Sequence, residues 1–78
     1  MTLNELKVGK EATVVSVKGG GALSRRIFDM GITPGVKVYL RKKAPLGDPL
    51  ELTVRGYELS LRAEEAKTIE IKEERENG

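Results

Sequence analysis

Side chains able to hold a metal ion or to carry covalent chemistry are few in this sequence, because cysteine and histidine are both absent. Their absence excludes structural zinc, haem ligation and catalysis by serine–histidine or cysteine–histidine pairs. The 12 acidic residues are the strong metal ligands that remain, but Glu64 and Glu65 point in different directions, and Glu73, Glu74 and Glu76 lie near the end of the chain. A preorganised iron site needs several converging oxygen ligands and a supporting shell. We therefore expect no resident metal, and at most weak metal binding through carboxylates.

Two adjacent arginines are the first candidates for binding chemistry, because a guanidinium can pair with both oxygens of a carboxylate. Arg25 and Arg26 lie in "ALSRRIFDM", whose apolar spacing predicts a short helix. Arg26 lies near the apolar stripe of this helix, so both a structural use and a partner contact are open for it. Arg25 is expected to face solvent.

The glycine triplet that precedes this helix is a candidate phosphate-binding loop, because backbone N–H groups at a helix start bind anions. The segment "GGGALSR" lacks the Gly-Lys-Ser/Thr ending that places a lysine on phosphate and a hydroxyl on magnesium. We therefore interpret the triplet as a flexible connection between a strand and the helix.

The sequence "PLGDP" at residues 45–49 contains two prolines and one glycine between two predicted strands. Few conformations are open to such a loop, which stabilises a fold by lowering the entropy of the unfolded chain. Leu46 has no apolar partner in the predicted hairpin, and a rigid loop that presents a leucine loses little entropy on binding. The predicted partner-binding residues are Arg25, Arg26, Pro45, Leu46, Gly47 and Pro49.

Hydrophobic periodicity predicts the elements that must position these residues. Leu23, Ile27 and Met30 form one stripe of a helix, and apolar residues alternate with polar ones in the other segments, as in half-buried strands. Five short strands, with one helix between the first and the second, predict a small, strongly bent all-β barrel rather than a sandwich, which needs more strands. The expected strands are 11–17, 36–44, 50–55, 58–61 and 68–71, and the expected helix is 22–30.

The expected strands 50–55 and 58–61 should form a hairpin around Gly56 and Tyr57. A two-residue turn with glycine first suits a type II′ geometry. This turn would place Val54 opposite Leu59 and so pair apolar residues on one face.

A five-residue loop at 45–49 predicts the register of the preceding hairpin. It would place Leu40 opposite Val54 and bring opposite charges together on the other face. It would also place Lys42 on the inner face opposite Leu52, so that its side chain has to reach the rim of the sheet.

The aromatic residues are one phenylalanine and two tyrosines. Phe28 lies about 140° from Leu23 on a helical wheel, and we expect it to be buried in so small a domain; an exposed Phe28 would be a strong candidate for a binding hot spot. Tyr39 and Tyr57 are too few to build the aromatic groove with which peptide-binding SH3 domains hold proline-rich ligands.

Length and charge set the remaining expectations. The 78 residues predict one domain at 1–72 and a polar tail at 73–78. Residues 18–62 carry nine basic and four acidic residues, and a basic body favours an acidic partner surface. No basic-then-apolar signal segment and no apolar run of about 20 residues is present, so a cytoplasmic location is expected.

Several landmarks occur together in order: "GGG" before "RRIFDMGITPG", then "APLGDPL", "VRGYELSLR" and "EEAKTIEI". From Leu3 to Ile71 the chain resembles the FeoA family, ferrous iron transport protein A. The resemblance implies an SH3-like β-barrel. It also implies a non-enzymatic cytosolic accessory protein, without catalytic residues or cofactor, that regulates bacterial ferrous iron uptake by contact with the cytosolic domain of FeoB. FeoB is a membrane permease with a GTP-binding domain, so the chain would reach the membrane only through this partner.

Two alternatives to this function stay open. The same fold forms the C-terminal domain of iron-dependent repressors, which favours a regulatory module, although no helix-turn-helix precedes the barrel here. The basic run from Lys37 to Lys43 favours a small RNA-binding barrel, but stacking aromatics are few and we expect no nucleic-acid partner. Open edge strands also allow a weak homo-oligomer.

Overall fold

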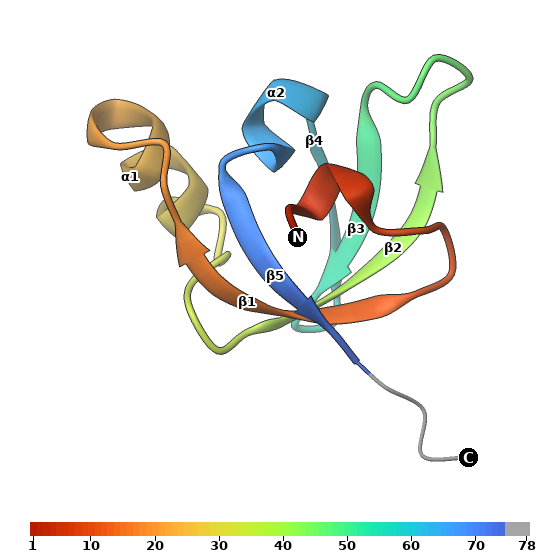
Figure 1. The fold of residues 1–78 in the computed structure, drawn as a ribbon, viewed down its shortest axis with the longest axis horizontal. Coiled ribbons are helices and arrows are strands. Elements are labelled where there is room, and N and C mark those ends of the chain that lie inside the picture. The colour runs from red at the N-terminus through yellow and green to blue at the C-terminus, as the bar shows by residue number, and fades with distance from the viewer. Residues whose placement is uncertain (75–78) are drawn as a thin grey trace.

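The structure is a computed structural model that describes residues 1–74, and it contains five β-strands, two α-helices and one short 3₁₀ helix (Figure 1). The predicted number of strands, and the helix between the first and the second, are confirmed. The predicted tail at 73–78 lies largely outside the described residues. The elements are η1 Leu3–Glu5, β1 Glu11–Val17, α1 Gly21–Asp29, β2 Lys37–Lys43, β3 Leu50–Val54, β4 Tyr57–Leu61, α2 Ala63–Ala66 and β5 Ile69–Glu73.

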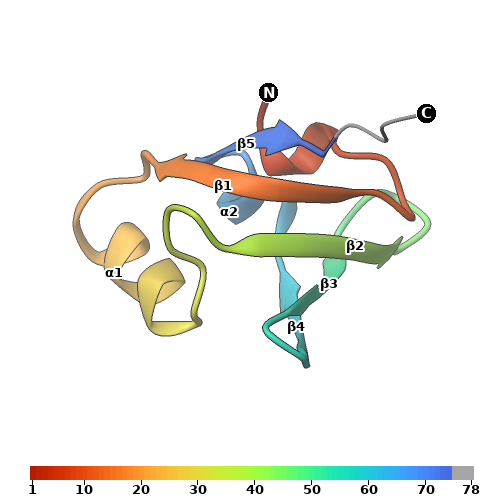
Figure 2. The same ribbon diagram turned by 90° about the horizontal axis from the view of Figure 1, so that it is seen from below.

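All five strands belong to one antiparallel sheet with the order β4-β3-β2-β1-β5. The sheet is strongly bent: in Figure 2, β1 and β2 run side by side, whereas β4 crosses their direction steeply. The edge strands β4 and β5 are joined through α2, so this short helix covers the space between the two ends of the sheet (Figure 1).

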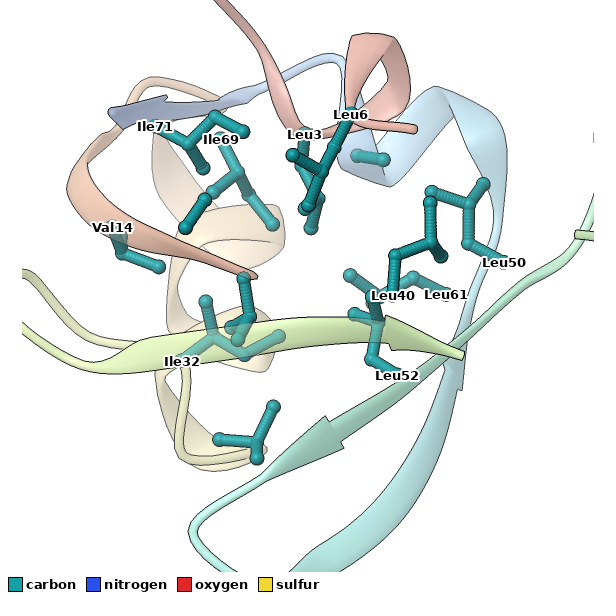
Figure 3. Packing of buried hydrophobic residues seen from close by; sticks show 14 of the residues in the cluster. Leu3, Leu6, Val14, Ile32, Leu40, Leu50, Leu52, Leu61, Ile69 and Ile71 are labelled. Atoms are coloured by element: carbon teal, nitrogen blue, oxygen red, sulfur yellow. The ribbon is translucent and has the colours of Figure 1, made fainter. Parts of the chain in front are cut away.

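Aliphatic side chains from every strand and from the helical segments form a single core, part of which is drawn in Figure 3. The strands supply it through the predicted alternation, most clearly in β3, where Leu50, Leu52 and Val54 are buried and the two residues between them are half-buried. The buried apolar residues are Leu3, Leu6, Ala12, Val14, Ile27, Ile32, Val36, Val38, Leu40, Leu50, Leu52, Val54, Leu61, Ala66, Ile69 and Ile71.

Helix α1 packs on the core through one side only. Ile27 is fully buried, and Leu23 and Met30 of the predicted stripe are partly buried against the core. Phe28 is 41% exposed, so the expectation that it is buried is wrong. The reason is that α1 contacts the core through Leu23, Ile27 and Met30, so a residue well away from the Leu23 stripe stays partly exposed. Phe28 is therefore an exposed aromatic residue, which makes it a candidate for a binding hot spot.

The hairpin between β3 and β4 has a different turn from the predicted one. Val54 pairs with Tyr57, so the two turn residues are Arg55 and Gly56. Both have positive φ, 51° and 85°, as a type I′ turn requires. The predicted pairing of Val54 with Leu59 is therefore wrong by two residues, a shift that keeps every side chain on its predicted face.

The hairpin between β2 and β3 contains a bulge that the predicted register lacks. Leu40 pairs with Leu52, but Lys42 pairs with Glu51, which leaves Arg41 as an extra residue on β2. The predicted placement of Lys42 opposite Leu52 is wrong, because the bulge turns Lys42 outward, where it is exposed. The extra residue is held by ion pairs from Arg41 to Glu51, 3.6 Å, and to Glu58, 3.3 Å.

Lys43 is instead the lysine that reaches the rim of the sheet. It pairs with the buried Leu50, its side chain is half-buried, and its Nζ donates a 3.1 Å hydrogen bond to the carbonyl oxygen of Asn4. The ammonium group therefore stays hydrogen-bonded while the aliphatic stem covers the core.

The start of the chain gives a pH-dependent contact. The backbone N–H of Thr2 donates a 2.7 Å hydrogen bond to Glu5, and this bond lowers the pKa of the Glu5 carboxyl below its ordinary value of 4.5. Because the folded-state pKa is depressed, the stabilisation is present above pH 4.5 and is lost as the pH falls through the folded-state value.

We expect Glu5→Gln to lower the melting temperature slightly at pH 7, and this difference to shrink as the pH falls from 4.5 toward 3. Thermal unfolding of both proteins across this range measures the difference. A constant difference at all pH values would show that the carboxylate charge does not contribute.

Candidate functional site

A pocket of about 340 Å³ lies between α1, α2, the end of β4 and the loop that joins β2 to β3. Three segments that are distant in sequence contribute to it, namely α1, residues 48–49 and residues 60–65, so the fold and not a local motif builds this pocket. Its lining residues are Arg26, Asp48, Pro49, Ser60, Leu61, Arg62 and Glu65.

Glu65 is the centre of the polar contacts at this pocket. It is only 7% exposed, yet each of its carboxylate oxygens has a partner. Oε1 accepts a 2.8 Å hydrogen bond from the backbone N–H of Arg62, and Oε2 forms a 3.1 Å ion pair with Arg26 Nη2. The first contact fixes the start of α2, and the second joins α2 to α1. A buried carboxylate is stable here because both of its oxygens have such partners.

Asp48 joins the β2–β3 loop to the same helix. Its Oδ1 accepts a 3.0 Å hydrogen bond from the backbone N–H of Ala63, the first residue of α2. The loop is therefore anchored to α2 at one end as well as to its own two strands.

Two backbone hydrogen bonds close the loop itself. Ala44 N–H donates to the carbonyl oxygen of Pro49 at 3.0 Å, and Gly47 N–H donates to the carbonyl oxygen of Ala44 at 2.7 Å. Gly47 has a φ of 82°, which glycine adopts without strain. Leu46 at the tip is 97% exposed. The loop thus presents a leucine to solvent on a backbone with few free dihedral angles.

The structure separates the six predicted site residues into two groups. Arg26 and Pro49 line the pocket, whereas Arg25 is exposed on α1, and Pro45, Leu46 and Gly47 form the tip of the loop. In Figures 1 and 2, α1 and this loop lie at opposite ends of the molecule with α2 between them.

Three charged pocket residues were missed from the sequence, namely Asp48, Arg62 and Glu65. A local signal existed for Glu65, because an acidic residue three positions after a helix start is typical of a capping box, in which it accepts a hydrogen bond from the N-cap backbone. No local signal connects Glu65 to Arg26, since that contact depends on how α1 and α2 pack.

The arginines give the mouth of the pocket its charge. The Arg26 side chain is 66% exposed and Arg62 is exposed, whereas Glu65 is almost fully covered. Both arginines therefore face solvent together with the exposed Asp48, and the negative charge of Glu65 lies beneath them.

Neither an acidic cluster nor a long apolar helix is present among the described residues. Within residues 1–74, the structure places no three acidic side chains where they could together hold a metal ion. None of the helices formed by these residues is long and apolar enough to cross a membrane.

Comparison with known proteins gives a family and a relative in sequence. The family model described as the FeoA domain matches residues 1–73. A Fe(2+) transport protein A/Fe(2+) transporter FeoB fusion protein of Porphyromonas gingivalis (strain ATCC BAA-308 / W83) is 39% identical over 71 residues. This match covers 91% of the chain and 8% of the relative, so the chain spans a small part of that protein.

Solved structures of related proteins have the same fold. A FeoA-like protein from Clostridium acetobutylicum has a TM-score of 0.91 and 40% identity, over 100% of this chain and 91% of that one. FeoA of Stenotrophomonas maltophilia, solved with zinc and described as a prokaryotic SH3 domain protein, has a TM-score of 0.81 and 34% identity, over 92% and 89% of the two chains. The predicted SH3-like barrel is therefore confirmed.

A manganese-dependent transcriptional repressor also shares the fold. Its TM-score is 0.85 and its identity 15%, over 94% of this chain and 36% of the repressor. At this identity the likeness concerns the fold alone. Since the FeoA domain model, by contrast, matches nearly the whole sequence, the chain belongs to the FeoA domain family.

Proposed function

We propose that this protein is a non-enzymatic accessory and regulatory protein of bacterial ferrous iron uptake, which binds the cytosolic domain of the permease FeoB. The observation that carries this proposal is the fusion in Porphyromonas gingivalis, in which a segment 39% identical to this chain is covalently joined to FeoB. Joining two proteins in one chain raises their effective concentration and suits partners that bind each other. A cytoplasmic location follows from this partner.

The contact surface in this proposal includes the loop tip formed by Pro45, Leu46 and Gly47. Leu46 is 97% exposed, and the hydrogen bonds from Gly47 and Ala44 already order the loop. Binding would therefore bury a leucine at a small cost in conformational entropy. Pro49, Arg25 and Arg26 are the other proposed contact residues.

Regulation by this contact requires a difference in affinity between states of FeoB. A binding protein shifts a conformational or nucleotide-dependent equilibrium only when it binds one state more tightly than another. Nucleotide dependence of the affinity is thus the property that distinguishes a regulator from a passive anchor.

We expect Leu46→Ala to weaken binding to the isolated FeoB cytosolic domain about tenfold, the usual loss for a hot-spot side chain. Calorimetry with and without a GTP analogue measures the affinity and its nucleotide dependence. Val8→Ala is the matched control, because Val8 is also an exposed aliphatic residue but lies outside the loop. Equal affinity of the Leu46 variant and the native protein would remove the loop tip from the contact.

A salt series with RNA in place of FeoB tests the nucleic-acid alternative. Contacts with phosphates make affinity fall steeply as salt rises. Salt-sensitive RNA binding without any FeoB binding would replace the proposed function.

Light scattering in the same buffers measures the weak self-association that the edge strands β4 and β5 allow.

A further inference from the structure

We propose that the pocket between α1, α2 and the β2–β3 loop is a carboxylate-binding site, which receives an Asp or Glu side chain from an acidic peptide segment of the partner. This inference rests on the proposed function, because it assigns the chemistry by which the partner is recognised. The proposed ligand is an acidic peptide segment and not a phosphate or a nucleic acid.

The acidic residues of the pocket are already engaged within the protein. Glu65 uses Oε1 for the backbone N–H of Arg62 and Oε2 for Arg26 Nη2. Asp48 uses Oδ1 for the backbone N–H of Ala63. These contacts fix the walls of the pocket. Glu65 neutralises part of its charge from below, whereas Asp48 is exposed.

The basic residues keep donors for a ligand. Arg26 contacts Glu65 through one of its three guanidinium nitrogens, and its side chain is 66% exposed at the pocket. Arg62 lines the same pocket, and no carboxylate of residues 1–74 lies within ion-pair distance of it. Two arginines that line one pocket are suited to hold the two oxygens of a carboxylate.

Shape and charge favour a single carboxylate over a phosphate. The volume of about 340 Å³ accommodates a side chain with its adjoining backbone, and Leu61 and Pro49 offer apolar contact to methylene groups. The charges of Asp48 and Glu65 balance those of Arg26 and Arg62, so a dianion would meet two fixed negative charges. A monoanionic side chain meets less repulsion and can share the unused guanidinium donors.

The direct test is an NMR titration of the isotope-labelled protein with N-acetyl-glutamate amide at constant ionic strength. We expect saturable shifts of the amides of Ser60, Arg62, Ala63 and Glu65. N-acetyl-glutamine amide, which has the same shape without the charge, should leave these amides unshifted. Equal shifts with both compounds, or no selective shift at any concentration, would overturn the assignment, as would stronger binding of inorganic phosphate at the same amides.

Arg62→Gln tests the same pocket with the partner. It removes one guanidinium that has no carboxylate within ion-pair distance among residues 1–74, so we expect an unchanged melting temperature, loss of the glutamate-induced shifts and about tenfold weaker FeoB binding. Arg55→Gln is the matched control, because Arg55 is an exposed arginine in the β3–β4 turn and does not line the pocket.

The two arms separate failure of the site from failure of the function. If FeoB binds the native protein and the Arg62 variant equally, the pocket proposal is overturned and the accessory function stands. If FeoB binds neither, the proposed function is overturned, and the glutamate titration alone decides whether the pocket takes a carboxylate.

Discussion

Leu52→Ala is expected to lower the free energy of unfolding by about 2–5 kcal/mol. Leu52 is fully buried in the interior strand β3, where it pairs with Leu40 on one side and with Leu59 on the other. Truncation loses the transfer free energy of the removed methyl and methylene groups and leaves a cavity that two hydrogen-bonded neighbouring strands cannot collapse to fill. Urea unfolding of the native and variant proteins measures the loss.

Leu46→Ala is the control, because it makes the same chemical change at a residue that is 97% exposed. We expect its free energy of unfolding to stay within about 0.5 kcal/mol of the native value. The pair separates stability from binding, since one leucine supports the fold and the other is proposed to contact FeoB. A large loss at Leu46 would mean that the loop packs on the core in solution.

The core and the exposed loop could both be predicted from the sequence, because each depends on a local pattern. Alternation along β3 sets Leu50, Leu52 and Val54 on one face whatever the neighbouring strand, and all three are buried. For Leu46, the lack of an apolar partner in the predicted hairpin agrees with its exposure.

Hairpin registers could not be predicted from that pattern. A shift of two residues preserves the face of every side chain, so Val54 opposite Leu59 and Val54 opposite Tyr57 satisfy hydrophobic alternation equally well. The turn decides between them, through the positive φ of both Arg55 and Gly56. In β2, the poor fit of Lys42 was visible in the sequence, but its relief through a bulge at Arg41 depends on Glu51 and Glu58 of two other strands.

The pocket could be predicted only in part for a related reason. Arg26 and Pro49 were identified by residue type, yet they meet at one pocket because Arg26 pairs with Glu65 of α2 and Asp48 of the loop accepts a hydrogen bond from the start of α2. Those contacts depend on the position of α1 relative to α2, which follows from packing against the sheet. A sequence pattern within one element carries no information on such a relation.

One polar contact and one glycine together fix the end of α1. The Tyr57 hydroxyl, at the start of β4, donates a hydrogen bond to the carbonyl oxygen of Met30. Gly31 follows with a φ of 92°, and a Cβ atom at this position would overlap the Tyr57 hydroxyl oxygen. The side chain that holds the helix end therefore also requires glycine next to it.

We expect Gly31→Ala to lower the free energy of unfolding by about 2–3 kcal/mol. Left-handed backbone costs an L-residue about 1–2 kcal/mol, and displacement of the Tyr57 hydroxyl adds the loss of one hydrogen bond, about 1 kcal/mol. Chemical denaturation measures the change. Since α1 carries Arg26, loosening of its end should also weaken the Arg26–Glu65 ion pair at the pocket.

A double-mutant cycle with Tyr57→Phe measures the coupling between the Tyr57 hydroxyl and the residue at position 31. The phenylalanine side chain lacks the overlapping oxygen, and the next ring atom lies 3.5 Å from the added Cβ, an ordinary contact distance. In the Tyr57→Phe background, Gly31→Ala should therefore cost only the backbone term, and the two single losses should together exceed the loss of the double variant by about 1 kcal/mol. Strict additivity would show that the hydroxyl and the glycine act independently.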